Sequence, residues 1–292
     1  MNVLAVGATG KYASLVVPEL KKRGVTVRAL VRDENRISAA HRAGADETAV
    51  GDLRDPDSLR AAAEGVDGVF HINPAFAPGE ADMGVAMVEA AKAAGARKFV
   101  FSSVIHPSLS KMVNHAAKAP VEEALYESGL DFTVLRPAMF MQNLDGAWSA
   151  VVESGKLTMP YSMRAKVCYV DFRDVAEAAA LAMTGGVLSY GTFELCAPGM
   201  VDRVEMAEMA SRALGKTVEA DELSPEAWAS DSGMPESPLR DGLTRMMTHY
   251  DLHGFPGGNA LVLRAVLGRE PRTLEGYFRE LANRSTRAAS TS

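Results

Sequence analysis

Runs rich in apolar and β-branched residues alternate with amphipathic segments along the first half of the chain. The apolar runs predict strands that are buried on both faces of a sheet. They read NVLAV, TVRALVR, DETAVGD, DGVFHI, RKFVFSS and DFTVLRP. The amphipathic segments between them predict helices at residues 11–23, 34–43, 55–65, 80–95 and 121–129.

This alternation predicts parallel βαβ units and a doubly wound sheet with helices on both faces. In such sheets ligands bind beyond the carboxyl ends of the strands, where the strand order reverses. The residues predicted at those ends are therefore the first candidates for a binding site. They are Gly7–Gly10, Arg32, Asp52, Asn73, Ser102–Ser103 and Pro137.

The regular alternation ends near residue 150, and the pattern after residue 200 is mostly helical. We therefore predict an α/β fold: a doubly wound parallel Rossmann sheet with a smaller, mostly helical C-terminal lobe that binds the substrate. The expected boundaries are 1–150 for the sheet domain, completed by about 167–197; 151–166 and 198–285 for the lobe; and 286–292 for a disordered tail without apolar anchors.

The composition, with 47% hydrophobic and 23% charged residues, is typical of a soluble globular protein. The net charge is −6 and basic residues are scattered, so no nucleic-acid partner is expected. No apolar run reaches the roughly 18 residues that span a membrane, and no signal peptide precedes NVLAV. We expect a cytoplasmic protein without a membrane partner, as a monomer or a homodimer.

Cys168 and Cys196 are the only cysteines. Their spacing does not fit a metal site, and a single disulfide would be unusual in so large a secreted chain. Both are expected to be reduced core residues, and no metal site is expected.

The turn after the first strand carries Gly7, Gly10 and Ala13 in the spacing of a dinucleotide-binding fingerprint. Glycine permits a tight turn and close approach of the backbone to phosphate, and the following helix directs free N–H groups at the pyrophosphate. The third position tolerates alanine. Because the turn lies between a strand and a helix, it predicts a bound dinucleotide. The contacts expected here are Gly7, Thr9, Gly10, Lys11 and Tyr12.

Arg32 ends the second strand about 25 residues after Gly7, where chains that bind NAD usually place an acid. An arginine there suits the 2′-phosphate of NADP, so NADP(H) is preferred over NAD(H). Asp33 follows directly and could instead serve as the acid for NAD. Asp52, or the backbone at Leu53, is placed to meet the adenine, although Asp52 also suits a helix-capping loop.

Several longer motifs resemble the NmrA-like group of atypical short-chain dehydrogenases/reductases from residue 1 to about 200, and the resemblance continues more weakly in YDLHGFPGGN and LGREPRTLEGYFREL near the end of the chain. The motifs in the first 200 residues are VGATG, ALVRD, GDLRDPDSL, KFVFSSV, KAPVEEALYESGLDFTVLRPAMFMQNL and YVDFRDVAEAAA. The resemblance implies the fold and an NAD(P) cofactor. The expected cofactor contacts also include the strand-end residues Asn73, Ser102, Ser103 and Pro137, with Pro74 beside Asn73, and the resemblance adds Lys118. The group includes NADPH-dependent reductases of quinones, dyes and phenylpropanoid compounds, and also regulators and redox sensors that bind the nucleotide without turnover.

The chain lacks the Tyr-x-x-x-Lys pair of classical short-chain dehydrogenases, because Asn114 stands where the tyrosine would be and only Lys118 is kept. Asparagine cannot act as a general acid at neutral pH. Lys118 matches the lysine that reductases of the group retain, so it is the predicted catalytic residue. It could bind the ribose, or act as the acid if burial lowers its pKa. His71, His106 and His115 are further possible proton donors.

Apolar side chains follow the later strands and predict a substrate pocket for a flat aromatic or quinone-like molecule. The residues expected to line it are Phe76, His106, Met139, Phe140, Met141, Trp148 and Tyr161. Others that could contribute are Met163, Met246, Met247, His249 and Tyr250. Packing in the core is the alternative interpretation for at least half of them.

The sequence therefore predicts an NADPH-dependent oxidoreductase that reduces a small apolar acceptor by hydride transfer. The alternative is a non-catalytic NADP(H)-binding redox sensor that acts through a protein partner. Sugar-nucleotide epimerisation is disfavoured, because it would need the missing tyrosine.

Overall fold

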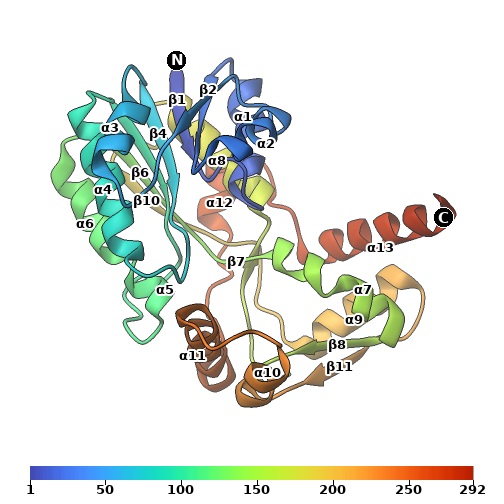
Figure 1. Ribbon diagram of the computed structural model, residues 1–292. Helices are drawn as coiled ribbons and strands as arrows, with labels where there is room; N and C mark the ends of the chain where they lie inside the picture. Colours follow the sequence, from blue (N-terminus) through green and yellow to red (C-terminus); the bar gives the residue numbers. More distant parts are fainter. Residues whose placement is uncertain (292) are drawn as a thin grey trace. The chain divides into compact units, whose positions relative to one another are not determined.

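The computed structural model of the protein describes residues 1–291, with side chains described through residue 287 (Figure 1). The chain forms two compact units. Unit 1 consists of Met1–Pro137 and Phe172–Glu194, and unit 2 consists of Ala138–Asp171 and the chain from Leu195 onward. We had expected the first boundary near residue 150, but the segment after Pro137 already belongs to unit 2.

Unit 1 is built on a seven-stranded sheet with the order β10-β6-β5-β4-β1-β2-β3. The strands are β1 (Asn2–Val6), β2 (Thr26–Val31), β3 (Glu47–Val50), β4 (Gly68–Ile72), β5 (Lys98–Ser102), β6 (Asp131–Pro137) and β10 (Gly191–Leu195). From β3 to β6 neighbouring strands are parallel, and the strand order reverses between β1 and β4. The predicted doubly wound parallel sheet is confirmed.

Helices cover both faces of this sheet (Figure 1). One face carries α3 (Pro56–Ala63), α4 (Glu80–Ala93) and α6 (Ala119–Ser128); the other carries α1 (Val16–Lys22), α2 (Ile37–Arg42) and α8 (Phe172–Thr184). Leu59, Met87 and Leu125 extend from α3, α4 and α6 into one apolar cluster with Phe99 and Phe101 of β5. Phe99 and Phe101 share this face because side chains two apart on a strand point the same way.

Local signals account for where several helices begin. Asp55 accepts a hydrogen bond from the backbone N–H of Asp57 and caps α3, with Pro56 in the first turn. The predicted helix at residues 11–23 begins instead with a 3-10 turn, η1 (Ala13–Leu15), before α1. Two further short helices, η2 (Glu34–Arg36) and α5 (Val113–Ala116), lie on loops that follow strands β2 and β5.

Unit 2 is mostly helical, with two small parallel pairs of strands, β8 with β11 and β7 with β9. Its elements are β7 (Met139–Phe140), η3 (Met141–Gly146), α7 (Trp148–Ser154), β8 (Lys156–Met159), β9 (Tyr169–Val170), α9 (Arg203–Leu214), β11 (Glu219–Glu222), α10 (Pro225–Asp231), α11 (Pro238–His253), α12 (Leu261–Leu267) and α13 (Leu274–Thr291). Asp145 accepts a hydrogen bond of 2.6 Å from the hydroxyl of Tyr277, and Trp148 packs on Phe278. These contacts join η3 and α7 to α13, which explains why unit 2 begins before residue 150.

Residues 286–291 are helical and continue α13, where we had expected a disordered tail; Ser292 lies outside the described residues. The helix is anchored by its buried apolar face, with Tyr277, Phe278 and Leu281 all at most 3% exposed. An established helix extends readily, because each added residue gains a hydrogen bond without a new nucleation cost.

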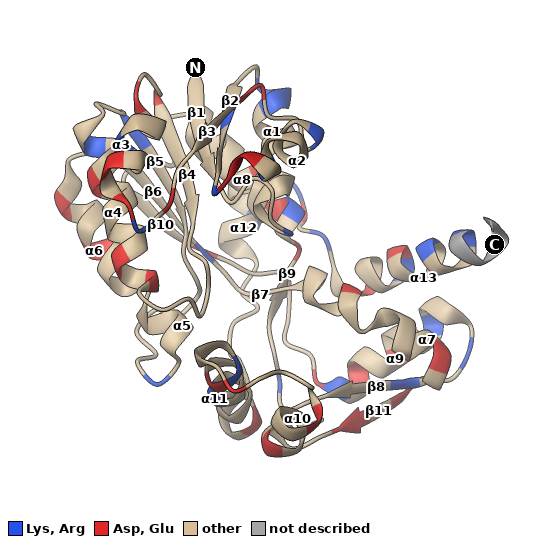
Figure 2. Cartoon of the chain, viewed as in Figure 1, with Lys and Arg blue, Asp and Glu red and all other residues tan. Residues whose placement is uncertain are grey.

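Cys168 and Cys196 are both buried and form no disulfide, as predicted. Within the described residues, no helix combines the length and apolar character that crossing a membrane requires. Figure 2 shows acidic residues on α4 and α6 and charges of both signs along α13. The absence of a nucleic-acid partner stays a prediction.

Candidate functional site

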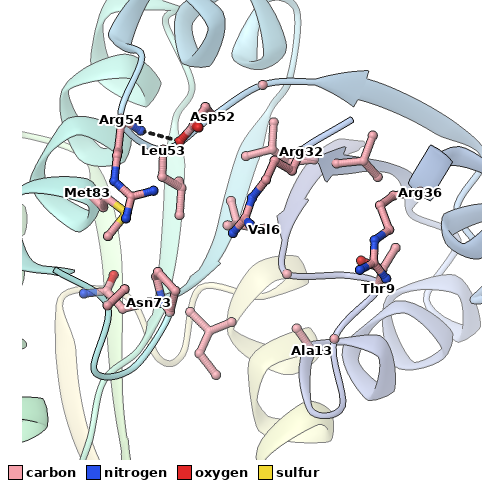
Figure 3. Close-up of a pocket in the computed structure, with 18 of the residues that line it drawn as sticks. Val6, Thr9, Ala13, Arg32, Arg36, Asp52, Leu53, Arg54, Asn73 and Met83 are labelled. Atoms are coloured by element: carbon pink, nitrogen blue, oxygen red, sulfur yellow. Dashed lines mark hydrogen bonds between the residues drawn. The ribbon is translucent and has the colours of Figure 1, made fainter. Parts of the chain in front are cut away.

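A cavity of about 460 Å³ lies at the carboxyl ends of β1 to β4 in unit 1 (Figure 3). This is where the strand order reverses, the place predicted from the alternation of strands and helices. Ten of the predicted cofactor residues line it: Gly7, Thr9, Gly10, Lys11, Tyr12, Arg32, Asp52, Leu53, Asn73 and Pro74. The other predicted contacts, Ser102, Ser103, Lys118 and Pro137, lie outside this lining.

The turn after β1 leaves no room for larger side chains. Gly7 has a positive φ of 79°, and a Cβ atom there would lie 3.1 Å from Ile72 Cγ2. The backbone N–H of Gly10 donates to the carbonyl of Gly7 at 2.7 Å, which closes the turn. The same Cβ atom would lie 3.4 Å from the methyl of Ala13, so glycine at position 7 leaves space beside that methyl. Alanine at the third position therefore fits the turn without displacing it.

Three arginines line the cavity. Figure 3 shows Arg32 and Arg36 from the end of β2 and the helix after it, and Arg54 from the loop after β3. Among the described side chains, neither Arg32 nor Arg36 has an ion-pair partner. Sequence reasoning found Arg32 but missed the other two. The available signals were the spacing of Arg36, four residues after Arg32, and the position of Arg54 two residues beyond a strand-end acid.

Both acids beside these arginines are engaged by their own loops. Asp33 accepts a hydrogen bond from the backbone N–H of Asn35 and caps η2. Asp52 Oδ1 accepts from the backbone N–H of Arg54 at 2.9 Å, the bond drawn in Figure 3. The backbone N–H of Asp52 donates to Ser58 Oγ at 3.1 Å. Asp52 therefore both shapes its loop and lines the cavity.

A buried polar network begins at Asn73, which lines the cavity, and extends into unit 1. Asn73 accepts from Nε2 of His71 at 2.5 Å and donates to the backbone carbonyl of Glu80 at 3.1 Å. His71 is fully buried and stacks on Phe101, and this burial lowers its pKa to about 4. A neutral imidazole without solvent access positions Asn73 rather than exchanging protons with a ligand.

Lys118 is buried, not a surface lysine, and its ammonium forms an ion pair with Glu80. It also donates to the backbone carbonyl of Asn114 at 3.1 Å. Burial lowers the pKa of Lys118, and the charge of Glu80 opposes that shift. The second carboxylate oxygen of Glu80 accepts from the backbone N–H of Phe76 at 2.8 Å. Sequence reasoning missed Glu80, whose only signal was an acid in the first turn of a helix after a strand-end loop.

The two serines at the end of β5 differ. Ser103 Oγ donates to the buried carboxylate of Glu122 at 2.6 Å, and Arg136 Nε donates to the same oxygen at 3.0 Å. Ser102 Oγ is fully buried and has no hydrogen-bond partner among the described residues. Ser102 is the register partner of Ile72, which lines the cavity. Of the two serines, Ser102 is therefore the one whose hydroxyl can still form a hydrogen bond.

The loop after β5 carries His106 in a left-handed backbone conformation, with φ of 56°. Nδ1 of His115, on α5, lies 3.1 Å from the carbonyl oxygen of His106, so Nδ1 carries the hydrogen. His115 is 1% exposed, and burial lowers its pKa to about 4. His106 itself is half-buried.

The predicted substrate residues are divided between the units. Phe76 and His106 are in unit 1, on the loops that follow β4 and β5. The others, all in unit 2, are Met139, Phe140, Met141, Trp148 and Tyr161. Trp148 donates from Nε1 to Ser285 Oγ at 3.0 Å and packs on Phe278, so its burial is explained inside unit 2. Tyr161 lies against the guanidinium of Arg203. None of the predicted substrate residues lines the described cavity, and their role toward a substrate stays a prediction.

A sequence model of the NmrA-like family matches residues 1–278. The chain belongs to the NmrA-like family. This confirms the resemblance seen in the motifs, and the matched range ends just after the first turn of α13.

Individual relatives agree with this family assignment. The chain is 34% identical over 248 residues to the NAD(P)H azoreductase of Xenophilus azovorans, and the match covers 84% of this chain and 85% of that protein. The solved structure of the NADPH-dependent quinone oxidoreductase of Escherichia coli, complexed with NADPH, matches with a TM-score of 0.84 at 23% identity, over 96% of this chain and 99% of that one. The triphenylmethane reductase of Citrobacter sp., complexed with NADP(H), has the same TM-score and identity over 97% and 100%. The structural matches show a shared fold.

Proposed function

We propose that the protein binds NADP(H) in the cavity at the ends of β1 to β4 and reduces a small apolar acceptor, quinone-like or aromatic. The observation that carries the proposal is the cavity itself. A glycine turn without room for a Cβ lies on one side of it, and arginines line it at the ends of β2 and β3. The close backbone approach suits a pyrophosphate, and the arginines suit a further phosphate. The relatives named above include an azoreductase, a quinone oxidoreductase and a dye reductase.

Preference for NADP(H) over NAD(H) is supported by the charges at the end of β2. Arg32 and Arg36 offer guanidinium donors, while the carboxylate of Asp33 is engaged in capping η2. A ribose with free hydroxyls would need that carboxylate, whereas a 2′-phosphate needs the arginines. The arrangement therefore favours the phosphorylated cofactor.

When bound, the reduced nicotinamide supplies a hydride. The chain's own residues provide binding and orientation around it. Ser102 Oγ has no hydrogen-bond partner among the described residues, and Ser102 pairs in register with Ile72 of the cavity lining, a place in the sheet that suits the nicotinamide end of the cofactor. Lys118 contributes a buried positive charge, and Glu80 fixes its position while also binding the backbone of Phe76. Phe76 thereby becomes a fixed apolar group on the loop after β4.

The activity is tested by mixing the protein with NADPH and following its oxidation with a panel of quinones, azo compounds and cationic triphenylmethane dyes. We expect oxidation with at least one class of acceptor. Tight NADPH binding without oxidation across the whole panel would contradict the reductase and favour the non-catalytic sensor.

The cofactor preference is tested with Arg32→Gln/Arg36→Gln. Losing both guanidinium donors to a 2′-phosphate should raise the Kd for NADPH by about 10²- to 10⁴-fold, because a hydrogen bond to a charged group contributes roughly 1.5–3 kcal/mol and two arginines are removed. The Kd for NADH should change by less than about twofold, because it has no phosphate there. Arg42→Gln, an exposed arginine on α2 outside the cavity lining, is the matched control. An equal loss of affinity for NADPH and NADH would contradict the proposal that Arg32 and Arg36 bind the 2′-phosphate.

A further inference from the structure

His106 has an uncommon backbone conformation. Its φ of 56° lies in the left-handed region, which strains a Cβ atom and which only a few per cent of non-glycine residues adopt, with asparagine and histidine among the more frequent. A bulky side chain kept at such a position points to a role for that side chain, because a smaller residue would fold there with less strain.

Two hydrogen bonds fix the strained peptide. The carbonyl oxygen of His106 accepts from the backbone N–H of Leu109 at 3.1 Å and from Nδ1 of His115, also at 3.1 Å. His115 is itself buried and neutral, so it remains a donor to this carbonyl over the physiological pH range. The loop therefore places the His106 ring by means of groups that do not change protonation.

His106 lies on the loop after β5, close in sequence to Ser102. Its loop starts at the end of β5, directly after Ser102, and the residue that fixes it, His115, lies on α5 one turn before Lys118. Of the three histidines on this side of unit 1, His71 and His115 are at most 1% exposed, whereas His106 is half-buried. His106 is thus the one of these three that is partly exposed, and its loop follows the carboxyl end of β5, the edge of the sheet at which ligands bind in this kind of fold.

We propose that His106 is the proton donor that replaces the missing tyrosine in the reduction of neutral acceptors, an inference that rests on the proposed function. A quinone becomes a hydroquinone when it gains one hydride and one proton. The imidazolium of His106 gives that proton from a ring N–H to an acceptor oxygen, becomes neutral imidazole and is protonated again by solvent. Imidazole is the side chain suited to this exchange near neutral pH. His115 acts as a positioning residue.

The test compares two kinds of acceptor in the full chain. A neutral quinone needs a hydride and a proton, whereas a cationic triphenylmethane dye needs the hydride alone. In His106→Asn, which adopts the left-handed conformation readily, we expect the rate with the quinone to fall by about 10²- to 10⁴-fold. The rate with the dye should stay within about twofold. The Tm of the cofactor-free protein should be unchanged or higher, and the Kd for NADPH unchanged. His253→Asn, an exposed histidine on α11, is the control.

His106→Gly provides a second variant, because glycine suits the same backbone and leaves space for added imidazole to restore the quinone rate. An equal fall with both acceptors, or no fall with either, would overturn the role of His106 while leaving the reductase in place. A wild-type protein that binds NADPH but reduces neither acceptor would instead overturn the proposed function.

Discussion

Lys118 could be identified from the sequence, but its ion-pair partner could not. Its residue type and its position four residues after Asn114 single it out, and it can act as an acid only if burial lowers its pKa. The structure meets that condition and adds Glu80 as its ion-pair partner. Glu80 could not be predicted, because the pair joins the starts of two helices, α4 and α6, that are distant in the sequence and meet only in the packed fold.

Removing Lys118 alone should lower the free energy of unfolding more than neutralising both Lys118 and Glu80. Lys118→Met leaves the carboxylate of Glu80 buried beside an apolar side chain, so we expect the free energy of unfolding to fall by about 3–5 kcal/mol. Lys118→Met/Glu80→Gln should recover part of this loss, because no unpaired charge remains and Gln can still accept from Phe76. Denaturant unfolding of the cofactor-free protein measures both.

The control for this pair is Lys22→Met, which breaks an exposed ion pair with Glu19 and should cost less than about 1 kcal/mol. A double variant no more stable than Lys118→Met would show that the lysine contributes by packing rather than by neutralising Glu80.

At the scale of elements, the main strands and helices of unit 1 were predictable because their signals are local. Asp55 as a cap and the apolar run of β5 each depend on a few adjacent residues. The strand β11 was not predictable, because its sequence EADE is polar and it forms only by pairing with β8. The buried guanidinium of Arg203 donates to the carbonyl of Asp221 and stabilises that pairing. Such a contact between distant segments leaves no periodic pattern.

Gly84 sets how closely α4 can approach its neighbours. A Cβ atom there would overlap Cγ2 of Val121 on α6 and lie 2.7 Å from Oδ1 of Asn73. Gly84→Ala should therefore lower the free energy of unfolding by about 1–3 kcal/mol, although alanine is the better helix former by about 1 kcal/mol. It should also weaken NADPH binding, because Asn73 must move. Thermal unfolding and an NADPH titration test this.

Gly146→Ala is the matched control, since a Cβ atom at Gly146 would meet nothing within 4 Å. Its Tm should be unchanged or slightly higher. If Gly84→Ala behaved in the same way, the spacing of α4 and α6 would not depend on the missing side chain.

At the scale of the whole chain, the place of the site followed from topology, because parallel strands bring their carboxyl ends to one edge. That rule placed Gly7, Arg32 and Asn73 around one cavity without knowledge of side-chain contacts. It could not place Arg36 or Arg54, which follow strand ends by several residues and reach the cavity through the shape of their loops. The division at Pro137 likewise depends on packing in unit 2.

The stability of the protein should fall as the pH is lowered through the range of ordinary histidine titration. His71 and His115 have pKa values of about 4 in the folded state, below the ordinary value of 6.5, because burial disfavours the charged ring. Above pH 6.5 both states are neutral and the histidines have no effect. Below it the unfolded chain binds protons that the folded chain does not, so each histidine lowers stability by about 1.4 kcal/mol per pH unit until about pH 4.

This slope is measured by denaturant unfolding between about pH 5 and 6.5, because acids with a lowered pKa, such as Asp46 and Asp67, lose their stabilising contribution below about pH 5. His71→Asn should reduce the slope by about 1.4 kcal/mol per pH unit, whatever it does to stability at neutral pH. His253→Asn, in an exposed position, is the control variant. An undiminished slope in His71→Asn would mean that the folded protein protonates His71 as readily as the unfolded chain does. The ring could then not be the permanently neutral donor that fixes Asn73 at the edge of the cavity.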